Sequence, residues 1–204
     1  MIQRVIEMAV PRGTHRLIAV VPPEVPEMYD VERIVLSKVT DGAARTVTLA
    51  IHLSQCDLDD PLMIVNSDQL LDWNVNNMLD DPYVAGSDGA VVLFKADGST
   101  RWSYAECNGG NIVRIAEKQP ISNWATAGVY YWRRTYDFLD AATAMMATDD
   151  RVNGEFYVAP TYNYAIREGA RIAPFVISTT AFHDLGTPEA LDAYLSRTVT
   201  RVGN

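Results

Sequence analysis

Two aspartates occupy places in the sequence where a carboxylate could bind a divalent metal ion. Asp68 follows residues 61–66 (PLMIVN), an apolar run that predicts a buried strand, after a single serine, and Asp184 lies within residues 182–188 (FHDLGTP). A carboxylate at the carboxyl end of a strand can hold Mg²⁺ while water and phosphate oxygens complete the coordination. The local pattern leaves a second interpretation open for each residue. Asp68 would then cap a helix that begins near Leu70, and Asp184 would be a turn or cap residue.

A second group of polar residues has the types that recognise sugar hydroxyls and phosphate. Glu117 and Lys118 end a predicted strand, where the lysine could meet a phosphate as a point charge and the glutamate could bind hydroxyls. Asn153 and Glu155 flank Gly154, which allows a ligand to approach the backbone closely. Each pair also has a plainer interpretation, the first as a solvated strand end and the second as the start of a helix.

Other residues give weaker indications of chemistry. The histidines have no metal-ligand spacing, and neither cysteine has a local nucleophile pattern. Asp57-Leu58-Asp59 has the spelling of a glycosyltransferase metal site, but it precedes the apolar strand and does not end one. The scattered residues are His15, His52, His183, Cys56 and Cys107.

The composition is that of an ordinary globular protein, with 204 residues of which 48% are hydrophobic and 21% are charged. The formal net charge of −9 argues against nonspecific binding to nucleic acid or anionic lipid, because both require a basic face. No apolar run approaches the length of a membrane span and no leader pattern is present, so we expect neither secretion nor membrane insertion. Two cysteines without CxxC spacing predict a cytoplasmic protein.

Strands alternate with helices along the chain, which predicts an α/β fold with a mostly parallel sheet flanked by helices. We expect a β-hairpin of residues 103–106 and 112–117, inserted around the turn at Asn108-Gly109-Gly110. One domain spans residues 1–195, and residues 196–204 form a frayed tail. The other expected strands are residues 17–21, 61–66, 89–95, 126–132 and 172–177, the expected helices are 2–9, 31–36, 70–79, 136–147, 157–168 and 188–195, and residues 46–52 could be either.

Five segments, in their order along the chain, resemble the sugar-phosphate nucleotidyltransferases. The likeness is greatest to the branch found in capsule and surface-polysaccharide gene clusters, and it covers residues 1–195. The resemblance implies a Rossmann-like fold and an enzyme that joins a sugar 1-phosphate to the α-phosphorus of a nucleoside triphosphate and releases pyrophosphate. These two substrates are the implied partners, and a homo-oligomer is compatible with the family. The segments are IVNSDQLLDW, WSYAE, IAEKQPISNWATAGVYYW, RVNGEFYVAPTYN and LGTPEAL.

The resemblance also implies roles for individual residues. Asp68 and Asp184 would be catalytic carboxylates that hold Mg²⁺, the implied cofactor, against the α-phosphate. Lys118 would be a third catalytic residue, although Gln119 separates it from Pro120 and so departs from the Glu-Lys-Pro spacing of the family. The implied substrate-binding residues are Glu117, Gly128, Asn153 and Glu155, and the implied nucleotide-binding residues are Gly42 and Ala43.

The likeness departs from the family at the beginning of the chain. The family opens with a strand and a glycine-rich loop that carries an arginine, followed by a Lys-Pro-Leu stretch, and MIQRVIE matches the helix after that stretch. We therefore expect the first strand and the triphosphate loop to be missing from this sequence. Three interpretations remain: a start assigned roughly 30 residues too late, a catalytically silent relative that binds sugar phosphate or regulates a partner, and a gap filled by another chain.

Overall fold

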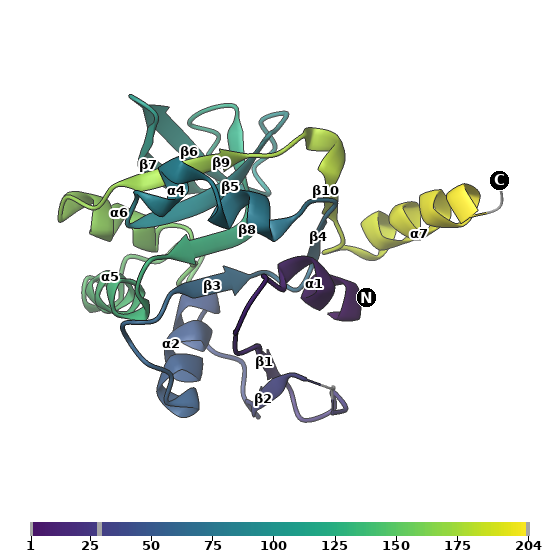
Figure 1. The fold of residues 1–204 in the computed structure, drawn as a ribbon, viewed down its shortest axis with the longest axis horizontal. Coiled ribbons are helices and arrows are strands. Elements are labelled where there is room, and N and C mark those ends of the chain that lie inside the picture. The colour runs from purple at the N-terminus through teal and green to yellow at the C-terminus, as the bar shows by residue number, and fades with distance from the viewer. Residues whose placement is uncertain (1, 28–29, 203–204) are drawn as a thin grey trace.

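A six-stranded sheet forms the centre of the molecule (Figure 1), and the computed structural model describes residues 2–27 and 30–202. In spatial order its strands are β3 (Leu62–Val65), β8 (Trp124–Trp132), β5 (Gly89–Lys95), β9 (Ile172–Val176), β7 (Asn111–Glu117) and β6 (Ser103–Asn108). Two smaller sheets pair β1 (Ile18–Val21) with β2 (Glu32–Val35) and β4 (Gln69–Leu71) with β10 (Phe182–Asp184). The helices are α1 (Ile2–Ala9), α2 (Ala43–Ser54), α3 (Val75–Leu79), α4 (Pro82–Ala85), α5 (Thr135–Ala147), α6 (Thr161–Arg167) and α7 (Pro188–Val202). A mixed α/β fold with a central sheet and flanking helices is thus confirmed.

The strand directions in the central sheet are mixed. β8 lies between β3 and β5 and is antiparallel to both. β7 is antiparallel to β6 and β9, whereas β5 and β9 form a parallel pair. The expectation of a mostly parallel sheet is therefore wrong for the described strand pairs, because β8 enters from later in the chain and separates two strands that share a direction. β3, β5 and β9 nevertheless run the same way, so their carboxyl ends meet at one edge of the sheet.

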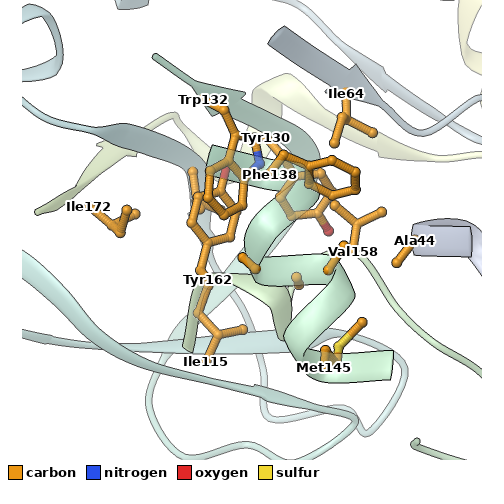
Figure 2. Packing of buried hydrophobic residues seen from close by; sticks show 14 of the residues in the cluster. Ala44, Ile64, Ile115, Tyr130, Trp132, Phe138, Met145, Val158, Tyr162 and Ile172 are labelled. Atoms are coloured by element: carbon orange, nitrogen blue, oxygen red, sulfur yellow. The ribbon is translucent and has the colours of Figure 1, made fainter. Parts of the chain in front are cut away.

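The hydrophobic core lies on both faces of this sheet, and β5 shows how one strand contributes to both. Val91 and Leu93 pack into one cluster with α2, α5 and α6, while Val92 and Phe94 pack into a second cluster with α3 and α4. Successive side chains of a strand point to opposite faces, so a strand that is buried on both sides is apolar throughout. Figure 2 shows the first cluster, in which the rings of Trp132 and Tyr162 stack with centroids 4.2 Å apart.

Several predicted elements have the expected type. Residues 2–9 and 89–95 form α1 and β5 with the predicted bounds, and the hairpin of β6 and β7 closes through Gly109 and Gly110, both at positive φ. The strands predicted at 17–21, 61–66, 126–132 and 172–177 and the helices predicted at 136–147 and 188–195 are also confirmed in type, with shifted ends. Residues 46–52, which were ambiguous, belong to α2.

Other predicted elements are wrong, because a partner elsewhere in the chain overrides the local pattern. Residues 31–36 hold β2, which pairs in parallel with β1, and are not helical. Residues 70–79 begin with β4, and α3 starts only after Asn74, whose side chain caps it. The helix predicted at 157–168 is restricted to α6. The helix predicted at 188–195 continues as α7 to Val202, the frayed tail expected at 196–204 stays a prediction, and residues 203 and 204 lie outside the described residues.

The amino-terminal part of the chain stands apart from the central sheet. β1 and β2 form their own two-stranded sheet, and β3, the nearest strand of the central sheet, pairs with β8 alone among the described residues. In Figure 1 this small sheet lies below β3, while α7 projects to the right, beyond α1 and β4. None of the described helices is long and apolar enough to cross a membrane.

Candidate functional site

The small sheet of β4 and β10 brings Asp68 and Asp184 together. β10 pairs with β4 so that Asp184 lies opposite Gln69, the residue after Asp68, and the backbone N–H of Leu185 donates to the carbonyl oxygen of Asp68 at 2.8 Å. A Cβ atom at Gly186 would lie 3.1 Å from Asp68 Oδ2 and 3.3 Å from Asp184 Oδ1. Both carboxylates therefore converge beside Gly186, and we call them the carboxylate pair.

The geometry also decides between the local interpretations of the two aspartates. Residues 69–71 are strand β4, so Asp68 does not cap a helix near Leu70. Asp184 Oδ1 accepts the N–H of Gly186 at 3.0 Å, which is a turn contact, and the same side chain still faces Asp68. The cap of α7 is instead Thr187, whose hydroxyl oxygen accepts the N–H of Ala190 at 3.2 Å.

The carboxylate pair is strongly negative and partly withdrawn from water. Burial raises the pKa of Asp68, and the charge of Asp184 raises it further, against the hydrogen bond from its own backbone. Arg101 forms an ion pair with Asp184, with Nη1 2.9 Å from Oδ2. The pair is thus a place where additional positive charge is favourable.

The residues of the carboxylate pair fit a Mg²⁺ ion in the type of their donor atoms. Mg²⁺ prefers hard oxygen ligands and is often bound through one or two carboxylates, with waters and substrate phosphates as its other ligands. Within residues 2–27 and 30–202, no group of three or more His, Cys, Asp or Glu side chains gathers around one point. A metal bound here would therefore depend on Asp68 and Asp184 for its protein ligands.

Glu117 ends β7 and Lys118 follows it, and these two residues, which we call the Glu-Lys pair, line the same cavity as the carboxylate pair. Glu117 is only 6% exposed, and its carboxylate accepts a short hydrogen bond from the hydroxyl of Ser103 on the neighbouring strand β6. Burial raises the pKa of Glu117, and the nearby charge of Glu155 adds to that effect, while Ser103 and Lys118 oppose it. The carboxylate is therefore held in place by the sheet itself.

The Lys118 side chain is positioned by an aromatic residue from a distant part of the chain. Lys118 Nζ donates to the hydroxyl oxygen of Tyr157 at 2.7 Å and lies 4.8 Å from the centroid of its ring. This hydrogen bond is the main reason that the pKa of Lys118 is raised, so its ammonium group stays charged at neutral pH. The backbone of Lys118 has a positive φ of 57°, and its N–H donates to the carbonyl oxygen of Trp102 at 3.0 Å.

A cavity of about 1430 Å³ connects these groups to the amino-terminal part of the chain. It extends from α1 and β1 across β3 to both the carboxylate pair and the Glu-Lys pair, and Ala43 at the start of α2 also lines it. Five of the predicted site residues therefore lie on one cavity: Asp68, Asp184, Glu117, Lys118 and Ala43.

Four other predicted site residues lie outside the lining of this cavity. Gly128 has a φ of 73° and packs against Gln69 and Asn66, so a side chain at this position would overlap Gln69. Gly42 is held against the backbone of Phe156, where any Cβ atom would collide. Asn153 and Glu155 belong to an exposed turn with φ of 50° at Asn153, although Glu155 is near enough to influence the Glu-Lys pair. Close packing therefore explains why positions 42 and 128 are occupied by glycine.

Three residues of the site were missed in the sequence because their importance depends on contacts between elements. Arg101, Ser103 and Tyr157 each bond to a predicted site residue from another strand or loop. All three lie in or directly beside the segments WSYAE and RVNGEFYVAPTYN, so these segments were the available signal.

The chain belongs to the nucleotidyl transferase family, whose profile matches residues 1–198. Among solved structures it is similar to a nucleoside-diphosphate-sugar pyrophosphorylase from Vibrio cholerae RC9, with 26% identity and a TM-score of 0.71 over 81% of this chain and 68% of that one. It also shares the fold of a putative glucose-1-phosphate thymidylyltransferase from Bacillus anthracis, solved in complex with a sucrose, at 18% identity and a TM-score of 0.63. That match covers 80% of this chain and 63% of the other. No curated protein sequence matches the chain.

Proposed function

We propose that this nucleotidyltransferase transfers a nucleoside monophosphate from a nucleoside triphosphate to a sugar 1-phosphate. A phosphate oxygen of the sugar 1-phosphate attacks the α-phosphorus, the bond from that phosphorus to the bridging oxygen breaks, and pyrophosphate leaves with the electron pair. The observation that supports this reaction best is the convergence of Asp68 and Asp184 beside Gly186, on the same cavity as Lys118. The membership of the family and the likeness to a nucleotide-sugar pyrophosphorylase agree with it.

In this proposal the two pairs have separate tasks. Asp68 and Asp184 would hold Mg²⁺, which supplies charge neutralisation at the phosphates when bound. Lys118 would place its ammonium group against the phosphate of the sugar, as its raised pKa allows. Glu117 would accept hydrogen bonds from sugar hydroxyls, and Asn153 and Glu155 would approach the sugar when their exposed turn moves inward.

The remaining assignments of the family are proposals of the same kind. Because Gly128 has no side chain, the sugar would lie against its backbone. Gly42 and Ala43, at the start of α2, would lie beside the nucleobase. We also propose that the nucleotide sugar supplies a capsule or surface polysaccharide and is made in the cytoplasm. A homo-oligomer is compatible with this function.

A second candidate function is a catalytically silent relative that binds sugar phosphate or regulates a partner. One observation favours it: every arginine that lines the cavity in the described part of the chain already has a carboxylate partner. The triphosphate would then lack free cations on the side of α1 and β1. These ion pairs are Arg12 with Asp80, Arg16 with Glu32 and Arg101 with Asp184.

The deciding experiment is an assay of pyrophosphate release with all common nucleoside triphosphates against a panel of sugar 1-phosphates and Mg²⁺. The protein is assayed as residues 1–204 and with the codons directly upstream of Met1 included. In the described residues β3 pairs only with β8, so its other edge is open. Pyrophosphate release from either form would support the proposed reaction. If both forms bind sugar 1-phosphate saturably and neither releases pyrophosphate, the proposed reaction is overturned and a catalytically silent binding protein is favoured.

A further inference from the structure

Arg101 is the one residue of the site whose position the proposed reaction does not explain. It lies in the connection between β5 and β6, and its side chain is 58% exposed. Nη1 donates to Asp184 Oδ2 at 2.9 Å, and the guanidinium carbon lies 4.7 Å from the centroid of the Trp102 ring. The positive charge thus rests on an aromatic face and reaches one of the two carboxylates.

Both carboxylate oxygens of Asp184 already accept a hydrogen bond. Oδ1 accepts the N–H of Gly186 at 3.0 Å, and Oδ2 accepts from Arg101 at 2.9 Å. Each oxygen has a second lone pair and can still ligate a metal ion. A divalent cation on Oδ2 would nevertheless lie beside the positive charge of Arg101, which sits on a mostly exposed side chain and can move away.

The ion pair is poorly suited to a purely structural role. An Arg–Asp contact with one exposed partner contributes little to folding, because water screens the charges and the long side chain loses freedom. The same contact has a large effect on any cation that approaches Asp184, since like charges a few ångströms apart repel each other.

We propose that Arg101 is an exchangeable latch on the carboxylate pair. In the absence of metal its guanidinium group neutralises Asp184, and a divalent cation displaces it from Oδ2. The released side chain stays beside Trp102 on the cavity that also holds Lys118, where its charge faces an incoming phosphate. The latch rests on the proposed function, because it requires that Asp68 and Asp184 bind a metal ion. It makes metal binding weaker in the empty site than the two carboxylates alone would allow.

The first test is a Mn²⁺ titration of the protein without substrates, in which electron paramagnetic resonance measures the free ion. Arg101→Gln removes the competing charge, and we expect the dissociation constant for Mn²⁺ to fall about three- to thirty-fold. Arg101→Lys keeps the charge without the planar fork and should remain closer to the unaltered protein. The matched control is Arg134→Gln, because Arg134 forms a similar ion pair with Asp137 (2.8 Å, side chains 51% and 24% exposed), has no part in the lining of the cavity and loses the same charge.

The second test follows the movement of the guanidinium group with Mg²⁺, which does not quench fluorescence by paramagnetism. If Mg²⁺ displaces Arg101 from Asp184, the contact with Trp102 changes, and tryptophan emission should shift on saturation. The shift should be absent in Arg101→Gln and in Trp102→Phe. A Mg²⁺-dependent shift that persists in Arg101→Gln would show that the emission change does not report this residue and would contradict the latch.

The outcomes separate the latch from the proposed function. If Arg101→Gln binds Mn²⁺ no more tightly than the control while Asp184→Asn loses binding, the metal site stands and the latch is overturned. If neither the unaltered protein nor any variant binds Mn²⁺, both proposals are overturned. Tighter binding in Arg101→Gln without pyrophosphate release from any form would support the latch and leave the reaction refuted.

Discussion

The Glu-Lys pair and the carboxylate pair line one cavity, but the protein holds them with very different rigidity. Glu117 is buried in the central sheet, and Ser103 and Tyr157 fix the two side chains of its pair from neighbouring elements. The carboxylate pair lies at two three-residue strands outside the central sheet, and Arg101, its cationic partner in the described part of the chain, is mostly exposed. A site of this design has a preformed half that can select a substrate and an adjustable half that can accept an ion.

The largest expected effect on activity comes from removing a carboxylate of the adjustable half. Asp184→Asn keeps the shape and the N–H contact with Gly186 but lowers the charge that would hold a metal. We expect pyrophosphate release to fall about a thousand-fold or more. The melting temperature should change little, because Asp184 contributes to β10 mainly through its backbone. An unchanged rate at saturating Mg²⁺ would contradict a role for Asp184 as a metal ligand.

A methyl group between the two carboxylates should have the next largest effect. Gly186→Ala places a Cβ atom 3.1 Å from Asp68 Oδ2 and 3.3 Å from Asp184 Oδ1, so the carboxylates must shift slightly from their observed positions. We expect Mn²⁺ binding and pyrophosphate release to weaken together, by about ten- to a hundred-fold. Gly86→Ala is the control, since Gly86 has an ordinary φ of −85°, its Cβ would lie 3.3 Å from the carbonyl oxygen of Pro82, and it does not line the cavity. Full metal affinity in Gly186→Ala would mean that the carboxylates do not need their observed positions.

The rigid half should respond to the loss of a single hydroxyl group. Tyr157→Phe keeps the ring under Lys118 but removes the oxygen that accepts its hydrogen bond. We expect KM for the sugar 1-phosphate to rise about ten-fold, with a smaller change in kcat. Tyr164→Phe is the matched control, because its hydroxyl bonds to Thr148 and Asp150 away from the cavity. A change in KM for the nucleoside triphosphate, with no change for the sugar 1-phosphate, would contradict the assignment of Lys118 to the phosphate of the sugar.

The smallest effect concerns stability and comes from burial of Glu117. Its pKa is raised in the folded protein, so the carboxylate opposes folding increasingly as pH rises above its ordinary value of 4.5. Glu117→Gln removes that dependence and can still accept the hydrogen bond from Ser103. We expect equal melting temperatures near pH 4 and an advantage of the variant that grows as pH rises above 4.5 and then levels off once Glu117 is ionised in the folded protein as well. Thermal unfolding measured across this range checks the sign, and a variant that is less stable at pH 8 would contradict it.

The sequence alone was sufficient wherever an element and its signal are local. Residues 89–94 are apolar because β5 is buried on both faces, and Gly109-Gly110 marks the hairpin of β6 and β7 directly. By contrast, β2 and β4 exist because β1 and β10 pair with them, and no pattern within residues 31–36 or 70–79 announces those partners. The strand directions were missed for the same reason, since the place of β8 between β3 and β5 is decided by packing.

The same difference between local signals and long-range contacts applies to the candidate site. The resemblance predicted that Asp68 and Asp184 lie together, and the resemblance itself was recognised from the order of the segments along the chain. Arg101 and Tyr157 could not be assigned in this way, because their relevance consists of one hydrogen bond each to a residue from a distant segment. The two glycines at positions 42 and 128 were singled out for ligands, and the structure shows each packed against protein atoms.

The pairing of β4 with β10 has a consequence for the order of events during synthesis. Asp68 is synthesised more than a hundred residues before Asp184, and β4 cannot pair with β10 until residues 182–184 have left the ribosome. Residues 89–132, which include β5, β6, β7 and β8, are synthesised before that pairing can form. If the carboxylate pair holds a metal ion as proposed, the ion can bind both carboxylates only after this late pairing.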